Sequence, residues 1–320
     1  MSFTHIRTLI ERLWPGCCPA DFDTHRITRF ATDPSKRHSK SGWIRLFPDG
    51  AAVVGDFRAD FKQYVAANGP VRSPGEARRI VAKAARLQEQ QRLEEAEMRT
   101  HAKADNAAFF DSADPLTQHD LGGKYLHSRH VYFHGGNKDR VLRFHKAAPY
   151  FEDRVLIGYF PAILSRVTDV NDEAVAIHRT YLDPMGGKAR VGNPKKLTMA
   201  SAPLVGSSIK LFKPRVCNGL RTIAIAEGLE TAVACFVLNG VPVEAATSAS
   251  LMRGYVWHRS IENLLIYTDN DENGAGQIAG AKLATRAHQA GLDCRILTPR
   301  NVGEDWADVL MNSRAKEQRL

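Results

Sequence analysis

Apolar positions in the last third of the chain alternate between short uninterrupted runs and longer periodic segments. The short runs have the length of strands and lie at 222–226, 243–246, 264–267 and 294–297. The periodic segments have the length of helices and lie at 230–239, 276–290 and 305–311. Uninterrupted apolar runs are typical of strands buried on both faces of a parallel sheet, and alternating strands and helices favour right-handed crossovers. The pattern predicts an α/β module, a small parallel sheet flanked by helices.

A different pattern precedes this module, from about residue 119 to residue 220. Residues 124–130 predict a short helix that leads into a loop. The β-like runs that follow lie at 141–145, 154–160, 162–167, 174–181 and 208–212. Their spacing predicts an antiparallel or mixed sheet. Between the last two runs, residues 186–196 form a glycine-rich basic loop.

The first 118 residues divide into a small module and a long helix. Residues 2–13 have an amphipathic helical pattern, and 43–47 and 51–57 predict two strands of a hairpin. A helix begins at Ser73, the predicted N-cap, and its polar middle is typical of a helix that bridges modules. We therefore predict an α+β chain overall: an N-terminal module over 1–72, a linking helix over 73–118, a basic subdomain over 119–220 and the α/β domain over 221–320.

Composition adds a division of charge to this picture. The 320 residues are 43% hydrophobic and 25% charged, which is ordinary for a globular protein. Lys and Arg number 44 against 35 Asp and Glu, a net charge of +9. The excess is uneven, because residues 221–320 hold 10 basic and 12 acidic side chains whereas residues 1–220 hold 34 and 23. We expect the basic part to attract a polyanion.

The same sequence argues against several classes of protein. No run of about 18 apolar residues is present, so no membrane-spanning helix and no membrane partner are expected. The N-terminal residues lack the apolar core of a signal peptide. The five cysteines include no CxxC pair, which argues against a zinc ribbon and against a disulfide framework. The expected location is therefore the cytoplasm.

Acidic residues follow two of the strands predicted in the α/β module. Glu227 comes directly after 222–226, and Asp269 and Asp271 follow 264–267. Ligands of open α/β sheets bind outside the carboxyl ends of the strands, so we expect these three carboxylates to converge there. Converging carboxylates repel one another unless a cation neutralises them or one stays protonated. Hard oxygen ligands of this kind suit Mg²⁺, with Mn²⁺ as an alternative.

Glycines beside these carboxylates support the interpretation. Gly228 frees the backbone directly after Glu227, so that the chain can turn into the following helix. Gly274 and Gly276 permit tight turns and leave a helix N-terminus open, where a phosphate could bind. The alternative is that the Asp269 loop is a surface turn with a helix cap.

A third acidic cluster follows the fourth predicted strand. It contains Asp305, which we expect to reach the same site, and Asp308, which could assist at the start of the last helix. The alternative is a helix cap with an exposed face.

These motifs resemble the toprim domain, the catalytic fold shared by bacterial-type primases, type IA and type II topoisomerases and some nucleases. The resemblance is carried by Glu227-Gly228 after the first strand, by Asp269-Asn270-Asp271 after the third, and by the later acidic pair. In more detail, the order Glu-Gly-Leu-Glu-Thr-Ala, Asp-Asn-Asp, Gly-x-Gly-Gln and Asp-Trp-x-Asp resembles toprim primases of plasmids, phages and integrative elements.

The upstream subdomain is similar to the same enzymes. Tyr125-Leu126 followed by Arg129 resembles the entrance of a primase polymerase core. Three later segments, 178–182, Gly186-Gly187-Lys188 and 194–197, resemble the basic motif that precedes toprim in primases, where basic residues face nucleoside triphosphate and template. The resemblance implies nucleotide or template binding by Arg129, Arg179, Lys188, Lys195 and Lys196. A solvated basic loop is the alternative.

The resemblance implies a DNA primase, which makes short RNA primers on single-stranded DNA from ribonucleoside triphosphates for plasmid, phage or mobile-element replication. Glu227, Asp269 and Asp271 would be catalytic and would hold Mg²⁺ together with Asp305. Glu227 could instead be a general acid or base. Replicative primases carry a zinc ribbon, which Cys17-Cys18 cannot form, and the missing GxxxxGK[ST] motif makes any helicase a separate partner.

Two other functions stay open at this point. A toprim nuclease would use the same carboxylates to cut DNA, and it differs from a primase in needing no basic groove for nucleotides. A non-catalytic DNA-binding protein could retain the toprim fold, although clustered carboxylates without a metal would be a cost to it. A topoisomerase is weaker, because its chemistry needs a tyrosine nucleophile in a separate domain.

Overall fold

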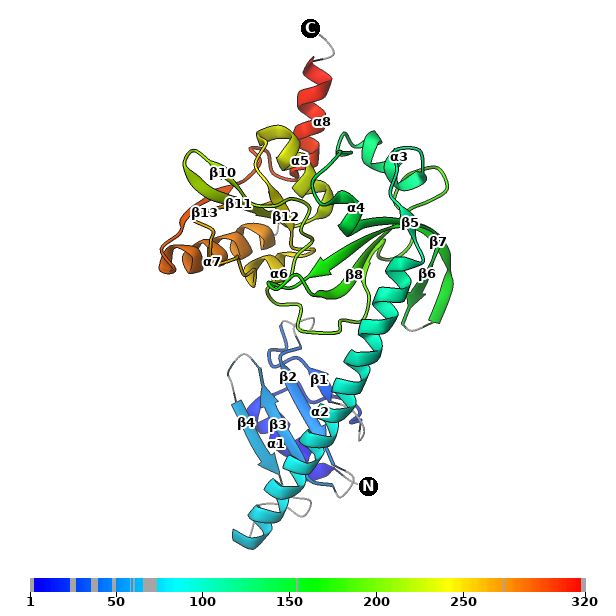
Figure 1. Ribbon diagram of the computed structural model, residues 1–320. Coiled ribbons are helices and arrows are strands. Elements are labelled where there is room, and N and C mark those ends of the chain that lie inside the picture. Colours follow the sequence, from blue (N-terminus) through cyan, green and yellow to red (C-terminus); the bar gives the residue numbers. More distant parts are fainter. Residues whose placement is uncertain are drawn as a thin grey trace. The chain divides into compact units, whose positions relative to one another are not determined.

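The computed structural model describes residues 3–23, 27–35, 40–47, 50–57, 59, 61–65, 74–153, 155–272 and 274–317. The chain folds into two compact units, Met1–Glu94 and Glu95–Leu320 (Figure 1). Within the described ranges, no helix combines the length and the apolar character that crossing a membrane requires.

The N-terminal unit is a small antiparallel sheet packed on one helix. Its strands are in the order β1-β2-β3-β4. Ile6 and Ile10 of the helix pack with Ile44 and Val54 of the sheet, which confirms the predicted helix and the predicted hairpin strands. The edge strands β1 and β4 are not predicted from the sequence, because one is three residues long and the other buries no side chain fully. The elements are α1 (Thr4–Leu13), β1 (Thr28–Phe30), β2 (Gly42–Leu46), β3 (Ala52–Asp56) and β4 (Phe61–Val65).

Helix α2 (Pro74–Asp111) confirms the predicted long helix, and its predicted N-cap, Ser73, lies outside the described residues. Ala102, Asn106 and Phe110 follow one another at intervals of about one turn and are all buried. Phe110 belongs to the core beneath the next sheet. The last turns of α2 are therefore part of the C-terminal unit, and the four-part division of the chain stays a prediction.

An antiparallel sheet in the order β5-β6-β7-β8-β9 follows α2 and confirms the predicted antiparallel or mixed sheet. The runs predicted at 154–160 and 162–167 form one long strand, and no strand forms at the predicted 208–212, where Ser208 and Ile209 make single bridges. The elements are β5 (Asp114–Pro115), α3 (Leu121–Ser128), α4 (Lys138–Val141), β6 (Leu142–Glu152), β7 (Val155–Thr168), β8 (Ala174–Tyr181) and β9 (Lys195–Leu197).

The last part of the chain is the predicted α/β module. Strands β11, β12, β13 and β14 are parallel, and β10, which the sequence did not predict, pairs with β11 in the antiparallel sense. The sheet is therefore mixed and mostly parallel. Helices α5 and α8 lie on one side of it, and α6 and α7 on the other (Figure 1). The elements are β10 (Arg215–Cys217), β11 (Leu220–Ala226), α5 (Leu229–Asn239), β12 (Val243–Ala245), α6 (Ala249–Arg253), β13 (Asn263–Tyr267), α7 (Ala275–Gln289), β14 (Asp293–Leu297) and α8 (Trp306–Glu317).

Strand β11 has apolar side chains on both faces, as the uninterrupted run in the sequence requires. Ile223 and Ile225 face a core that includes α7, whereas Ala224 and Ala226 face a core that includes α5. The second core continues into the preceding subdomain, where it contains residues of α3, β6 and β7. The subdomain and the α/β module therefore share one apolar core, and this core holds the two parts in a fixed relative position.

Candidate active site

The carboxyl ends of β11 and β13 bring the first two acidic motifs to one edge of the sheet. Ala226 is paired with Tyr267 in the parallel ladder, so that Glu227 follows one strand directly beside the segment that follows the other. Glu227 and Asp269 are partly buried, and Asp271 is exposed. The structure therefore places the predicted carboxylates at a common edge, as the strand pattern indicates.

Asp269 is in the least favourable environment for a charge. Burial raises its pKa to about 7, and the neighbouring carboxylates of Asp305, Glu227 and Asp271 act in the same direction against a weaker opposing effect of Lys195. Its Oδ1 atom is buried and has no hydrogen-bond partner among the described residues. A cation near this oxygen would relieve both the repulsion and the missing bond.

Glu227 is affected in the same direction. Burial raises its pKa, the backbone N–H of Ala249 opposes the rise, Asp271 adds to it and Lys195 opposes it. A Cβ added to Gly276 would lie 3.6 Å from Glu227 Oε2 and 3.5 Å from the carbonyl oxygen of Asp269. The N-terminal turn of α7 therefore lies close to the carboxylate of Glu227 and to the backbone of Asp269, and Gly276 adds no side chain to the space between them.

The loop after β13 is held by hydrogen bonds to the segment before α8. Asn270 Nδ2 donates to the carbonyl of Pro299 at 3.0 Å, and its Oδ1 accepts from Gln277 Nε2 at 3.0 Å. The backbone N–H of Asn270 donates to the carbonyl of Glu304. These bonds set the position of Asp269 and Asp271 on either side of Asn270.

Asp305 and Asp308 form a reciprocal cap at the start of α8. The backbone N–H of Asp308 donates to Asp305 Oδ1 at 2.8 Å, and that of Asp305 donates to Asp308 Oδ2 at 3.2 Å. Asp305 is also close enough to Asp269 to raise its pKa. Asp308 is thus engaged in capping, whereas Asp305 both caps the helix and adds its charge to the carboxylate edge.

Glu230, to which the sequence analysis assigned no role, is the most deeply buried acid near this edge. Its side chain is 4% exposed and lies 2.8 Å from Lys195 Nζ and 3.8 Å from Lys188 Nζ. Tyr125 donates its hydroxyl to Glu230 Oε1 at 2.8 Å. Burial opposes ionisation of Glu230, but Lys195 and Lys188 outweigh it and lower its pKa to about 2. The signal in the sequence was its place three residues after Glu227, on the first turn of α5.

The predicted basic residues divide into two groups. Arg129 lies close enough to Lys188 to lower the pKa of that lysine together with burial and Lys195. Arg179 instead donates to the carbonyls of Leu197 at 2.9 Å and Pro149 at 3.5 Å. Lys196 donates to the carbonyl of Phe151 at 2.5 Å. The first group therefore gathers beside the carboxylates, and the second ties β8 and β9 to β6.

The donors at this edge fit a divalent cation. Among the described residues, no three His, Cys, Asp or Glu side chains stand close enough together to enclose a metal ion. Mg²⁺, however, keeps several waters and takes only one or two direct carboxylates. Asp269 Oδ1 and Gln277 Oε1 are buried acceptors without a partner in this part of the protein. Glu227, Asp269 and Asp271 could hold such an ion through their carboxylate oxygens.

Comparisons with known proteins assign the segment that contains this edge to a family. Residues 222–315 match the family model described as a toprim domain. The C-terminal part of the chain is a toprim domain. Residues 100–208, upstream of the toprim domain, match a second family model, described as a domain of unknown function (DUF7146). No curated protein matches the sequence.

Solved structures that are similar to the chain include domains of DNA primases. A DNA primase domain from Pseudomonas aeruginosa is 16% identical with a TM-score of 0.45, over 68% of this chain and 77% of that one. The RNA polymerase domain of the Mycobacterium tuberculosis primase DnaG is 14% identical with a TM-score of 0.42, over 70% and 82%. The Aquifex aeolicus primase, with zinc-binding and RNA polymerase domains, is 12% identical with a TM-score of 0.42, over 88% and 74%. The chain thus contains a toprim domain with structural similarity to DnaG primase catalytic cores.

Proposed function

We propose that this protein is a DNA primase, which synthesises short RNA on a single-stranded DNA template. The observation that carries the proposal is the meeting of two sets of charges from different parts of the chain. Carboxylates lie at the carboxyl edge of the toprim sheet, and Lys188 and Lys195, from the upstream subdomain, lie against Glu230 directly behind that edge. Nucleotidyl transfer needs both, because it depends on positioning and on neutralising phosphate charge.

The carboxylates and the lysines would have different tasks in this reaction. Glu227, Asp269 and Asp271 would hold Mg²⁺, with Asp305 close by, and the bound ion would neutralise charge on the triphosphate and on the leaving pyrophosphate. Lys188 and Lys195 would attract the phosphates of the incoming nucleotide or the template. The buried carboxylate of Glu230 lies 2.8 Å from the ammonium group of Lys195 and 3.8 Å from that of Lys188, and it limits their movement.

For Arg179 and Lys196 we propose a smaller role than the family resemblance implies. Both side chains donate to backbone carbonyls of the sheet, and Lys196 also lies over the ring of Tyr150 at 4.3 Å. We propose that they hold the loop before Lys195 in place. Single-stranded DNA, ribonucleoside triphosphates and a separate helicase are the partners proposed, and the motifs favour a plasmid, phage or integrative-element context.

Primer synthesis in vitro tests the proposal. The full chain is incubated with single-stranded DNA, labelled ribonucleotides and Mg²⁺, and the wild type is expected to produce short RNA. Asp269→Asn should reduce the product about 100-fold or more, equivalent to roughly 2.7 kcal/mol of transition-state stabilisation. Glu272→Gln is the matched control, because Glu272 is exposed and next to Asp271 in the chain.

The variant should lose activity without losing its fold. Asparagine resembles the protonated carboxyl that burial and the neighbouring acids favour at position 269, so chemical unfolding in EDTA should show a stability equal to or above that of the wild type. If the assay yields shortened DNA and no RNA, the protein is a nuclease and the proposed primase function is wrong. DNA binding without either product would indicate a non-catalytic toprim protein.

A further inference from the structure

A cavity of about 340 Å³ lies where the upstream subdomain meets the toprim sheet, and its wall contains none of the carboxylates Glu227, Asp269 and Asp271. Glu244 of β12, which is paired with Ile225, belongs to this wall. Arg221 lines it at the start of β11, six positions before Glu227. A strand rises about 3.3 Å per residue, so the two residues are separated by about 20 Å along β11. The basic side chains that line the cavity are Arg140, Arg166, Lys210, Lys213, Arg221 and His258.

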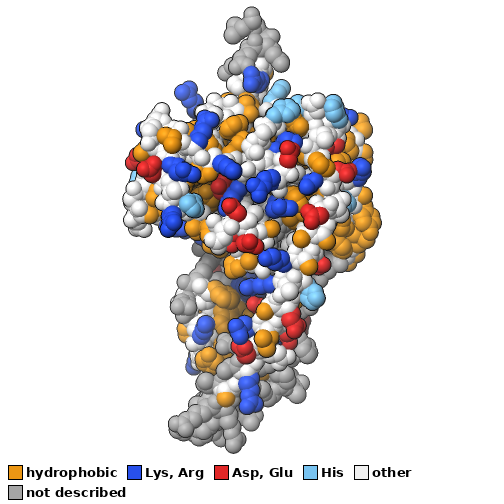
Figure 2. All heavy atoms as spheres, viewed as in Figure 1, with side chains coloured by type: hydrophobic (Ala, Val, Ile, Leu, Met, Phe, Trp, Pro, Cys, Tyr) orange, Lys and Arg blue, Asp and Glu red, His pale blue; other side chains and the backbone are white. Residues whose placement is uncertain are grey.

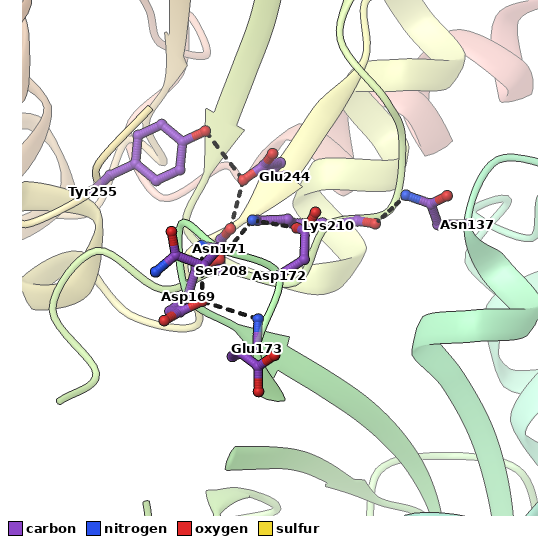
Figure 3. Close-up of polar contacts among 9 residues, drawn as sticks. All are labelled: Asn137, Asp169, Asn171, Asp172, Glu173, Ser208, Lys210, Glu244 and Tyr255. Atoms are coloured by element: carbon purple, nitrogen blue, oxygen red, sulfur yellow. Dashed lines mark hydrogen bonds and ion pairs between the residues drawn. The ribbon is translucent and has the colours of Figure 1, made fainter. Parts of the chain in front are cut away.

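Two ionisable groups of the cavity wall are already satisfied by the protein, as Figure 3 shows. Lys210 Nζ donates to Asp172 Oδ1 and to the carbonyl of Asp169, both at 2.6 Å. Glu244, which is buried, accepts from Ser208 Oγ at 2.5 Å and from Tyr255 OH at 3.1 Å. Lys210 and Asp172 therefore compensate each other, whereas the hydroxyls of Ser208 and Tyr255 hold Glu244 without cancelling its charge.

Arg140, Lys213 and Arg221 have no direct partner for their side-chain charges among the described residues, and they outnumber the one carboxylate, Glu244, that remains in the wall. Their side chains are exposed at the cavity and make no hydrogen bond or ion pair with any described residue. Arg166 lies 4.0 Å from Asp111 and over the ring of Phe110 at 4.1 Å. On the face drawn in Figure 2, Lys and Arg side chains gather across the C-terminal unit with carboxylates between them. The cavity concentrates several such cations around one hollow, where their field adds.

A buried hydroxyl gives a second, independent observation. Thr168 lines the cavity and is 7% exposed, and its Oγ1 atom is buried without a hydrogen-bond partner among the described residues. Buried hydroxyls in folded proteins are nearly always hydrogen-bonded, because an unpaired one costs about 1–3 kcal/mol. This oxygen is closed to solvent, so a ligand oxygen in the cavity would become its partner once the Thr168 side chain turns toward the cavity.

We propose that this cavity binds a phosphate group carried by a nucleotide or by a nucleic acid strand. Guanidinium groups match phosphate oxygens with paired N–H donors, and the ammonium of Lys213 adds a further charge. The apolar part of the wall, from Val141, Val256 and Phe212, could contact the sugar or base. The volume lies in the range of about 300–1,000 Å³ that is usual for small-molecule sites. The site stands apart from the carboxylate edge and does not depend on the proposed primase activity.

Binding without metal tests this proposal, because EDTA removes the contribution of the carboxylate edge. The full chain is titrated at low salt, in EDTA, with ATP in one arm and with a single-stranded DNA oligonucleotide in the other. Arg221→Gln should lower the affinity about 10-fold, the loss of a charge-assisted contact to phosphate. Thr168→Val, which keeps all charges, should lower it about 3-fold. Arg295→Gln is the control, because Arg295 is exposed on the same sheet and does not line the cavity.

The two arms separate the sources of the phosphate. A loss of affinity confined to ATP indicates a free nucleotide, and a loss confined to the oligonucleotide indicates the DNA backbone. Either outcome, or a loss in both arms, supports the site. The proposal is overturned when Arg221→Gln and Arg295→Gln bind both probes equally, or when the wild type binds neither. The titration measures binding in EDTA and not primer synthesis, so a failure of this proposal can be told apart from a failure of the proposed primase function.

Discussion

At the scale of single residues, two carboxylates of the toprim domain show how partners decide the role of a charge. Glu230 is almost fully buried, yet Lys195 and Lys188 lower its pKa to about 2. Asp269 is less enclosed, but burial and three acidic neighbours raise its pKa to about 7. Glu230 is therefore a fixed anion that organises cations, whereas Asp269 is an acid that lacks its counter-ion. The second environment is the one a metal ion would complete.

His178 gives a prediction about pH at this scale. Its side chain is 5% exposed, its Nδ1 has no partner among the described residues, and burial, with Lys195 and Arg179, lowers its pKa to about 4 despite Glu230. The unfolded chain has a histidine pKa of about 6.5, so it binds the proton first as the pH falls. The contribution of His178 to the free energy of unfolding should therefore be complete above about pH 6.5 and should be lost as the pH falls toward about 4.

The size of this effect can be measured by substitution. Between about pH 6.5 and 5, where most carboxylates stay ionised, His178 should contribute on the order of 1 kcal/mol per pH unit. Urea unfolding of the wild type and of His178→Gln at several pH values gives the two slopes. A shallower slope for the variant is expected, and equal slopes would contradict a neutral buried histidine.

At the scale of elements, the sequence predicted what is long and periodic and missed what is short. The strands and helices of the toprim domain are confirmed because apolar runs such as 264–267 must be buried on both faces. Strand β10 and helix α6 have three and five residues, too few for a period to show. The strand predicted at 208–212 is wrong, because within this segment only Ser208 and Ile209 form β-bridges, each with a different partner.

The candidate site was predictable in part for the same reason. Parallel strands bring Glu227 and Asp269 to one edge, so the position of these carboxylates follows from the order of elements alone. The pairing of Lys195 with Glu230 does not follow from the order of elements. The two residues are 35 positions apart, and they meet only because α5 packs against the upstream subdomain. A contact of this kind leaves no spacing in the sequence that could reveal it.

Glu230 should behave as a tether between elements. It receives hydrogen bonds from α3 through Tyr125 and from β9 through Lys195. Glu230→Gln leaves two lysines without an anion, so we expect a loss of about 2 kcal/mol, reduced from the usual 3–5 kcal/mol for a buried pair because both lysines are about one-third exposed. Thermal or chemical unfolding measures this loss. Glu272→Gln, at an exposed acid, should change the stability by less than about 0.5 kcal/mol. Equal losses of stability in the two variants would contradict the role of Glu230 as a tether.

Helix α7 offers a pair of glycines that tests how it packs on the sheet. A Cβ added to Gly280 would lie 2.5 Å from Thr268 Cγ2 and 3.3 Å from Ile266 Cγ2, both on or next to β13. Gly280→Ala should therefore destabilise the protein by about 1–3 kcal/mol, although alanine favours a helix. Gly276→Ala meets only ordinary contacts of 3.5 Å or more and should be neutral for stability. Unfolding in urea compares the two, and an equally stable Gly280→Ala would show that α7 can move away from β13.

At the scale of the whole molecule, the division of charge in the sequence acquires a spatial meaning. The acidic toprim domain carries its unpaired carboxylates at one edge, and the basic part of the chain supplies cations to that edge through Lys188 and Lys195. This local pairing leaves the net charge of +9 unchanged. The excess cations, among them Arg140, Lys213 and Arg221 of the cavity, are available to bind phosphate.

Salt dependence of DNA binding follows from this excess. A protein that neutralises several phosphates releases counter-ions, so the affinity for single-stranded DNA should fall at least about 100-fold between 50 and 200 mM salt. Lys188 is 38% exposed and only 3.8 Å from Glu230, so it can turn toward a phosphate, and Lys188→Gln should reduce the slope of log affinity against log salt by about one. Lys282→Gln, on the exposed face of α7, should leave the slope unchanged. Fluorescence anisotropy with a labelled oligonucleotide gives the slopes. A flat response of the wild type would contradict DNA binding by the basic part, and an unchanged slope for Lys188→Gln would assign that lysine to the nucleotide or to Glu230 alone.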